Sequence, residues 1–389
     1  MMNRIRANRR ILAVAVAGLA VVTVAATAFV VAQPFAVAQA VASATPSATP
    51  TAEPSPSASP SPTDTPTAEP TPTDSPDLLP SPLPTGWAYA DLDGVGAPAA
   101  DAHRLPMAIM VDDNTVARPQ SGISSASIVY QAYADGGEDR YMYVFQEGTA
   151  TDIGPIRSAR PYYVYWADEY HALYGHFGGD ANSVRVVIPA NAKYIYNMDD
   201  LSGGSCPYHR ITTRAAPHNA YTNTAALISC AAKKGYPATF QKLPTRTFKD
   251  DMPVANRPQS QTINIPYRTG TVGYQYNPTT DSYLRIMDGH PQVDPANGNN
   301  VYARTIVVMY QAYGTDPNSL DEANRPFVYN VGSGKATVFM EGQAIAATWK
   351  KTSNTALTRY YDSSGSEIPF VRGEIFMQST PTGTAITVK

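Results

Sequence analysis

Residues 106–111 read PMAIMV, an uninterrupted apolar run that ends at Asp112, Asp113 and Asn114. A run of this length, bounded by turn-forming residues, is typical of a fully buried β-strand. Three further strands are predicted nearby, at 128–134, 141–146 and 173–177. The first two are joined by the turn-rich sequence DGGED (135–139), and the third ends at Gly178 and Gly179.

Helices are predicted at two places in the same region. One covers 162–172, with Pro161 in its first turn, where a missing N–H costs nothing. The other covers 224–234, with Thr224 as N-cap and Gly235 as the C-terminal stop. Helices and strands that do not alternate regularly indicate an α+β fold for residues 86–250.

From residue 261 the pattern changes to short strand-like runs separated by turn signals. Such a pattern predicts a mostly antiparallel β-rich domain over 261–389, with 242–260 as the junction. The runs are 262–266, 272–276, 283–287, 303–310, 327–331, 336–340 and 344–349.

The first 85 residues do not resemble a globular domain. A basic start with four arginines precedes 22 residues without a charge, 11–32, and about 20 such residues span a membrane with the basic flank inside. Residues 1–40 are therefore predicted to be a signal-anchor or a signal peptide. The anchor is favoured because a signal peptide has an apolar region of only about 7–15 residues. Residues 41–85 are rich in Pro, Ser and Thr, which predicts a disordered stalk.

This topology places the folded part outside the cytoplasm, either anchored by a single N-terminal span or secreted. The net charge is −3, so there is no excess of basic residues that would predict nucleic-acid binding. The only two cysteines are Cys206 and Cys230, and an even number in an oxidising compartment favours a disulfide. Unpaired thiols or a redox role are the alternatives.

Arg157 and Arg160 lie where a turn leads into the first predicted helix. Two guanidinium groups beside free helix N–H groups could bind a carboxylate, phosphate or pyrophosphate. The alternative is that both arginines form internal ion pairs with acids such as Asp112, Asp113, Asp135 or Asp139. That alternative is favoured, because arginines in turns commonly form structural ion pairs.

Histidines supply the other candidate site residues. His176 and Asp180 flank the glycines that end a predicted strand, and His218 and Asn219 lie in a loop before the second helix. Together with His209 they could act in general acid–base catalysis. The spacing matches no known metal-binding pattern, so we predict neither a metal nor a cofactor.

Seven short motifs, in order, resemble the YerB-like lipoprotein family of bacterial envelope proteins with two tandem conserved regions. The resemblance covers 105–381 and implies a layered β/α sandwich followed by a mostly β region, with no established activity. The motifs are ARPQSG (117–122), GPIRSARP (154–161), HFGG (176–179), APHN (216–219), YLR (283–285), GSGK (332–335) and TWKK (348–351).

The chain departs from the family pattern at several places. An apolar segment and a stalk stand where members carry a lipid-modified cysteine. Gln131 and Asp135 replace part of a Glu-rich strand, and Asp180 replaces a serine. If that glutamate or serine has a catalytic role in other members, the same chemistry is not expected here.

The leading hypothesis is a module that binds an anionic or glycan-containing cell-wall ligand. Its site would be a cleft lined by both arginines and the histidine segments: Asp112, Arg157, Arg160, His176, Asp180, His218 and Asn219. Two alternatives stay open at this point, a scaffold that docks another envelope protein and a wall-polymer hydrolase or lyase with a histidine or carboxylate base.

Overall fold

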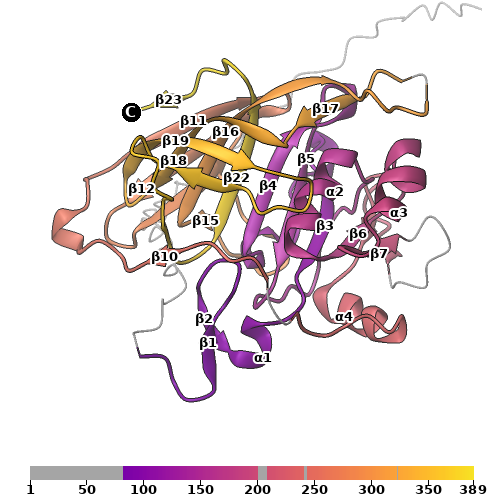
Figure 1. The fold of residues 1–389 in the computed structure, drawn as a ribbon, viewed down its shortest axis with the longest axis horizontal. Helices are drawn as coiled ribbons and strands as arrows, with labels where there is room; N and C mark the ends of the chain where they lie inside the picture. Colours follow the sequence, from indigo (N-terminus) through magenta and orange to yellow (C-terminus); the bar gives the residue numbers. More distant parts are fainter. Residues whose placement is uncertain (1–81, 200–207, 241–242, 322) are drawn as a thin grey trace, which may run out of the picture. The chain divides into compact units, whose positions relative to one another are not determined.

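The computed structural model describes residues 82–389 apart from 200–207, 241–242 and 322 (Figure 1). The predicted anchor and nearly all of the predicted stalk lie outside these residues. Within the described part of the chain, no helix is both long and apolar enough to cross a membrane.

A mixed eleven-stranded sheet forms the centre of the described fold, in the order β20-β19-β18-β16-β22-β4-β5-β3-β6-β7, with β17 paired to β16. The strands are β3 (Met107–Asp112), β4 (Ile128–Tyr133), β5 (Asp139–Phe145), β6 (Leu173–His176), β7 (Tyr196–Asp199), β16 (Thr305–Thr315), β17 (Pro326–Tyr329), β18 (Gly332–Met340), β19 (Gln343–Lys351), β20 (Arg359–Tyr361) and β22 (Ile375–Pro381).

Strand β22 joins the two parts of this sheet. It pairs in parallel with β16 on one side and with β4 on the other, and Figure 1 shows it between them. Strands from both sides of the predicted junction therefore share one sheet. The expected β/α sandwich within 86–250 is not confirmed, because its strands continue through β22 into the C-terminal strands.

A second, six-stranded sheet has the order β14-β13-β12-β11-β23, with β15 paired to β13. All its pairings are antiparallel, as predicted for most of the C-terminal region. Its strands are β11 (Thr262–Tyr267), β12 (Gly270–Asn277), β13 (Ser282–Met287), β14 (His290–Pro291), β15 (Tyr302–Ala303) and β23 (Thr387–Val388).

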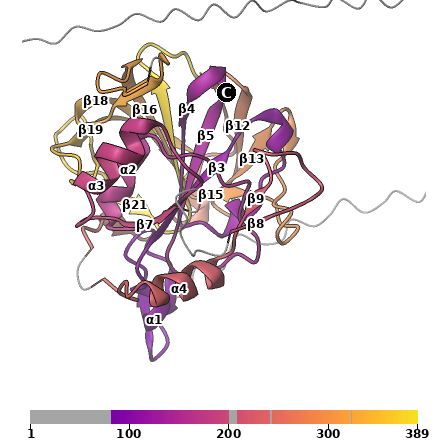
Figure 2. The ribbon, with the colours of Figure 1, turned by 90° about the vertical axis from the view of Figure 1, so that its right-hand side faces the viewer.

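Strand β3 is apolar from Met107 to Val111 because both its faces are covered. Ala108 and Met110 pack into one core with helix α2 (Pro161–Ala167), while Ile109 and Val111 pack into a second core with β12 and β13. Figure 2 shows α2 on one side of β3, β4 and β5, and β12 and β13 on the other. Alternate residues of a strand point to opposite faces, so a strand covered on both faces needs no polar positions.

Both predicted helices are present, with small differences at their ends. Helix α2 is shorter than predicted, because a 3₁₀ turn (Asp168–Tyr170) follows it and His171 has φ 49°, a left-handed conformation. Helix α4 (Thr224–Lys233) is capped by Asn223, whose side chain accepts a hydrogen bond from the Ala226 N–H at 2.8 Å. Thr224 is the N-cap expected from the sequence, but the observed N-cap is the preceding residue, Asn223.

The remaining elements are short. They are β1 (Trp87–Tyr89) paired with β2 (Gly96–Pro98), β8 (His209–Arg210) with β9 (Ala220–Tyr221), β10 (Phe248–Lys249) with β21 (Phe370–Val371), and helices α1 (Ala99–Ala102) and α3 (Ile188–Ala190).

A buried arginine connects the two sheets. Arg285 of β13 has no exposed surface, and its Nη2 donates to Gln131 Oε1 at 2.8 Å and to Tyr141 Oη at 3.1 Å. Gln131 in turn donates to Asp113 Oδ2 at 2.9 Å. Burial raises the pKa of Asp113 to about 6, although the positive charges of Arg118 and Arg285 oppose that rise. The network therefore depends on Arg285 for both hydrogen bonds and charge.

We predict that Arg285→Met lowers the free energy of unfolding by about 3 kcal/mol or more, because it leaves the buried acceptors Gln131 Oε1 and Tyr141 Oη without this donor and removes a positive charge near buried Asp113. Arg359→Met is the matched control. Its side chain is 34% exposed and its guanidinium pairs with Glu367, whose side chain is 26% exposed, so its loss costs at most about 1 kcal/mol. Urea unfolding of the full chain measures both values, and equal effects would contradict the structural role of Arg285.

A second buried charged group lies at the end of α2. Glu169 Oε1 and Lys351 Nζ are 2.8 Å apart, and neither side chain is exposed. The neighbouring Asp168 is also buried, and neither of its carboxylate oxygens has a hydrogen-bond partner within the described residues. Burial raises the pKa of Asp168 to about 8 against the opposing charge of Lys351. The ionised form of Asp168 is therefore unfavourable in the folded state.

This arrangement predicts how stability varies with pH. An unfolded aspartate has a pKa of about 3.9, so Asp168 contributes stability below pH 4 that is lost as the pH rises towards 8. We expect Asp168→Asn to remove this loss, so that the variant gains stability relative to the parent between pH 5 and pH 8. The gain is at most about 1.4 kcal/mol per pH unit.

Denaturant unfolding at each pH measures this gain. Asp250→Asn serves as the control, because the side chain of Asp250 is 90% exposed. The prediction is contradicted if the difference in unfolding free energy between Asp168→Asn and the parent stays constant from pH 5 to pH 8.

Candidate functional site

The motifs of the N-terminal region meet at the C-terminal end of β3. The backbone N–H of Asp112 donates to Pro155 O at 2.9 Å, which places the GPIRSARP segment beside the strand. Ile156 N donates to Ala220 O at 2.6 Å, just after the APHN motif, and Ala159 N donates to Gly178 O at 2.9 Å. Segments far apart in the sequence thus lie close together at this end of β3.

Asp112 is the centre of this cluster. Its Oδ2 accepts a hydrogen bond from His218 Nδ1 at 2.7 Å and lies 3.3 Å from Arg157 Nε. The carboxylate is buried, whereas the side chains of His218 and Arg157 are 18% and 23% exposed. The hydrogen bond uses Nδ1 and fixes the ring, so Nε2 is the nitrogen of His218 that a ligand can reach.

Arg160 is bound inside the protein. Its Nε donates to Asp135 Oδ2 at 2.9 Å, and Arg325 Nη1 donates to the same oxygen at 2.9 Å. Burial alone would raise the pKa of Asp135, but the hydrogen bond and charge of Arg160 lower it. The internal pairing considered for both arginines is thus present, with Asp112 for Arg157 and Asp135 for Arg160.

His176 and Asp180 also use their polar atoms within the fold. The fully buried His176 contacts Gly178 O through Nδ1 at 2.8 Å and Asn197 Oδ1 through Nε2 at 2.7 Å. Asp180 Oδ1 accepts from Ser183 N at 2.9 Å, which is how an N-cap residue satisfies a helix start.

Asn219 has a similar role in its loop. Its Nδ2 donates to Ile211 O at 3.1 Å, and its Oδ1 accepts from Arg210 Nη1. Of the seven predicted site residues, Asp112, Arg157 and His218 form a partly exposed group, and we call this group the Asp112 site. The other four position the segments around it.

Sequence reasoning missed two arginines near the Asp112 site. Arg140 pairs with Asp112 in the register of β3 and β5, and its Nη1 donates to Ser158 O at 3.1 Å. Burial and the nearby charges of Arg160 and Arg157 lower the pKa of Arg140 to about 10. Arg214 joins the loop of His218 to the loop after β3, through Nη2 to Pro119 O at 2.9 Å. No local sequence signal indicates either contact, because both depend on tertiary pairing.

Arg140 and Arg214 add positive charge to this part of the protein, which suits a negatively charged ligand. Within the described ranges, no group of three or more His, Cys, Asp or Glu side chains is placed to hold a metal. The proposed Cys206–Cys230 bridge stays a prediction. Cys230 is buried on α4, but Cys206 lies outside the described residues.

Comparison with known proteins identifies the two regions. The model of the N-terminal domain of a protein family described as "Protein of unknown function (DUF3048)" matches residues 93–237, and the model of its C-terminal domain matches 263–377. The two matched ranges contain all seven motifs described above.

A curated relative and a solved structure agree with this match. "Putative lipoprotein YerB" of Bacillus subtilis is 27% identical over 303 residues, which cover 77% of this chain and 88% of that protein. A crystal structure of the YerB protein from Bacillus subtilis aligns with a TM-score of 0.68 and 25% identity, over 77% of this chain and 99% of that one. The chain therefore belongs to the YerB-like family, whose two tandem regions these models describe.

Proposed function

We propose that this protein is held at the cell envelope, outside the cytoplasm, and binds an anionic or glycan-containing cell-wall ligand at the Asp112 site. Two observations support the location. The first is the basic and apolar N-terminal sequence, which is typical of an export signal or anchor. The second is the lipoprotein name of the curated relative.

One observation carries the binding proposal: the Arg157 guanidinium and the His218 imidazole, both partly exposed, share one buried carboxylate. Asp112 holds Arg157 and His218 in place through a 3.3 Å contact and a 2.7 Å hydrogen bond. Positioned donors bind an anion more strongly than free side chains do, because less conformational entropy is lost on binding. Buried Arg140 beneath them adds positive charge to the site.

We expect Arg157→Ala and His218→Ala each to weaken binding of the full chain to purified wall fragments by roughly tenfold or more. The reason is that a hydrogen bond to a charged group contributes about 1.5–3 kcal/mol. Sedimentation of the protein with wall fragments measures the affinity. Arg359→Ala and His290→Ala are matched controls, because both residues lie in the C-terminal region on strands β20 and β14. Unchanged binding by correctly folded Arg157 and His218 variants would contradict the proposal.

A second candidate function is hydrolysis of wall polymer, with His218 as general base. The carboxylate–imidazole hydrogen bond of Asp112 and His218 is the observation that favours it, because such a bond orients the ring and stabilises its protonated form. His218 Nε2 would then take a proton from the attacking water.

Zymography on cell-wall substrate between pH 5 and pH 8 tests this second candidate. Clearing by the parent chain and none by His218→Ala is the expected result for a hydrolase. Absence of clearing by the parent at every pH would leave binding as the function of the site.

A further inference from the structure

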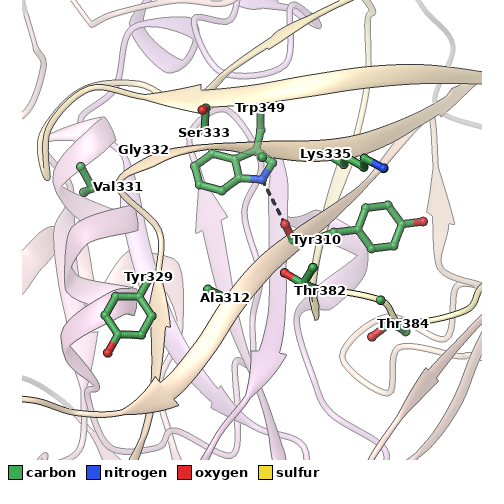
Figure 3. A pocket seen from close by; sticks show the side chains of 12 residues that line it. Tyr310, Ala312, Tyr329, Val331, Gly332, Ser333, Lys335, Trp349, Thr382 and Thr384 are labelled. Atoms are coloured by element: carbon green, nitrogen blue, oxygen red, sulfur yellow. Dashed lines mark hydrogen bonds between the residues drawn. The ribbon is translucent and has the colours of Figure 1, made fainter.

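A groove of about 640 Å³ lies in the C-terminal half of the central sheet, away from the Asp112 site. We call it the β17–β18 groove. It is lined by β16, β17, β18, β19 and the turn after β22, and its volume is within the usual range for small-molecule sites. Figure 3 shows Trp349 in the middle of the view, with Tyr329 on one side and Tyr310 and Lys335 on the other.

The groove exists because β16 changes its partner along its length. Its pairing with β18 ends at Met309 and Ala336, and its pairing with β17 begins at Ala312 and Tyr329. Between these points the sheet is open on that side of β16. On the other side β16 remains paired with β22 as far as Gln311, so the floor of the groove is held rigidly.

Two motifs build this floor together. Trp349 of TWKK lies opposite Gly334 of GSGK in the register of β18 and β19, and its Nε1 donates to Tyr310 O at 3.4 Å. A Cβ atom on Gly334 would lie only 2.6 Å from that Nε1. Glycine at 334 therefore lets the indole of Trp349 lie against strand β18.

The lining of the groove combines three aromatic side chains, hydroxyl groups and one cation. Tyr329 is 44% exposed, and Ser333, Thr382 and Thr384 supply hydroxyl groups. Lys335 is exposed and is the only charged residue of the lining. None of the ion pairs found among the described residues includes it, so its charge is available to a ligand.

From this lining we infer that the β17–β18 groove binds a carbohydrate that carries a carboxylate. The apolar face of Tyr329 suits the C–H face of a sugar ring, and the hydroxyl groups can both donate to and accept from sugar hydroxyls. Lys335 would form a charge-assisted hydrogen bond with the carboxylate.

An acidic peptide fits the groove less well. A peptide that adds to a strand edge gains specificity from pockets for its alternate side chains. Here the open edge of β18 begins with Gly332, Ser333 and Gly334, which form no such pockets. The inference is independent of the proposed function, because none of the groove residues belongs to the Asp112 site.

The test is calorimetric titration of the full chain with three probes: an oligosaccharide of galacturonic acid, a neutral galactose oligosaccharide of equal length, and an oligoglutamate peptide. We expect the acidic sugar to bind best. Tyr329→Ala should weaken its binding by about tenfold, since an exposed aromatic anchor is lost. Lys335→Gln should bring its affinity close to that of the neutral sugar.

Two controls separate this inference from the proposed function. Lys350→Gln changes an exposed lysine of the adjacent strand β19 that contacts the ring of Tyr361, and it should bind as the parent does. Acidic-sugar binding that survives Lys335→Gln but is lost in Arg157→Ala would place the sugar at the Asp112 site and overturn the inference. The inference is overturned if the peptide or the neutral sugar binds as well as the acidic sugar. It is equally overturned if folded Tyr329 and Lys335 variants bind like the parent.

Discussion

The insertion of β22 between β4 and β16 is the constraint on which the rest of the structure depends. Ile375 of β22 pairs with Ile128 of β4 and with Thr305 of β16, and both pairings are parallel. Parallel neighbours need long connections, and β22, the last long strand of the chain, completes a sheet whose first strand begins at Met107. The Asp112 site lies in the half of the sheet formed by strands that precede residue 200, on one side of β22. The β17–β18 groove lies in the other half, which is formed by strands that follow residue 300.

Several of the motifs that mark the family hold the two regions together. In ARPQSG, Gly122 N donates to Asp294 Oδ1 at 2.9 Å, and Arg118 Nη1 donates to Asp288 Oδ2 at 2.6 Å. In YLR, Arg285 reaches the central sheet through Gln131. Two of these contacts, Gly122–Asp294 and Arg285–Gln131, are buried, and buried hydrogen bonds of this kind favour one arrangement of the packed sheets. The two matched regions are accordingly joined by side chains as well as by the shared sheet.

Apolar runs in the sequence predicted the fully buried strands well. Strands with buried polar residues could not be predicted in this way, because their hydrogen-bond partners come from distant parts of the chain. Strand β3 was predictable because both its faces are buried. Strand β22 was not, since Gln378 and Ser379 are buried polar residues whose partners, Tyr274 Oη at 3.0 Å and Gln311 Oε1 at 2.7 Å, come from distant strands. The residues of the Asp112 site were also only partly predictable, because their burial depends on distant parts of the chain. The sequence indicated that Arg157 and Arg160 would pair with acids, but it could not distinguish the fully buried His176 from the partly exposed His218.

The central claim is that residues on both sides of 242–260 form one cooperative unit through β22. Native-state hydrogen exchange in increasing denaturant tests it most directly, because it reports the opening free energy of each strand. If the claim is correct, the amides of β3, β4 and β5 open with the same free energy as those of β16 and β22. Exchange of the N-terminal strands through a separate opening, at least about 2 kcal/mol below that of β16 and β22, would contradict it.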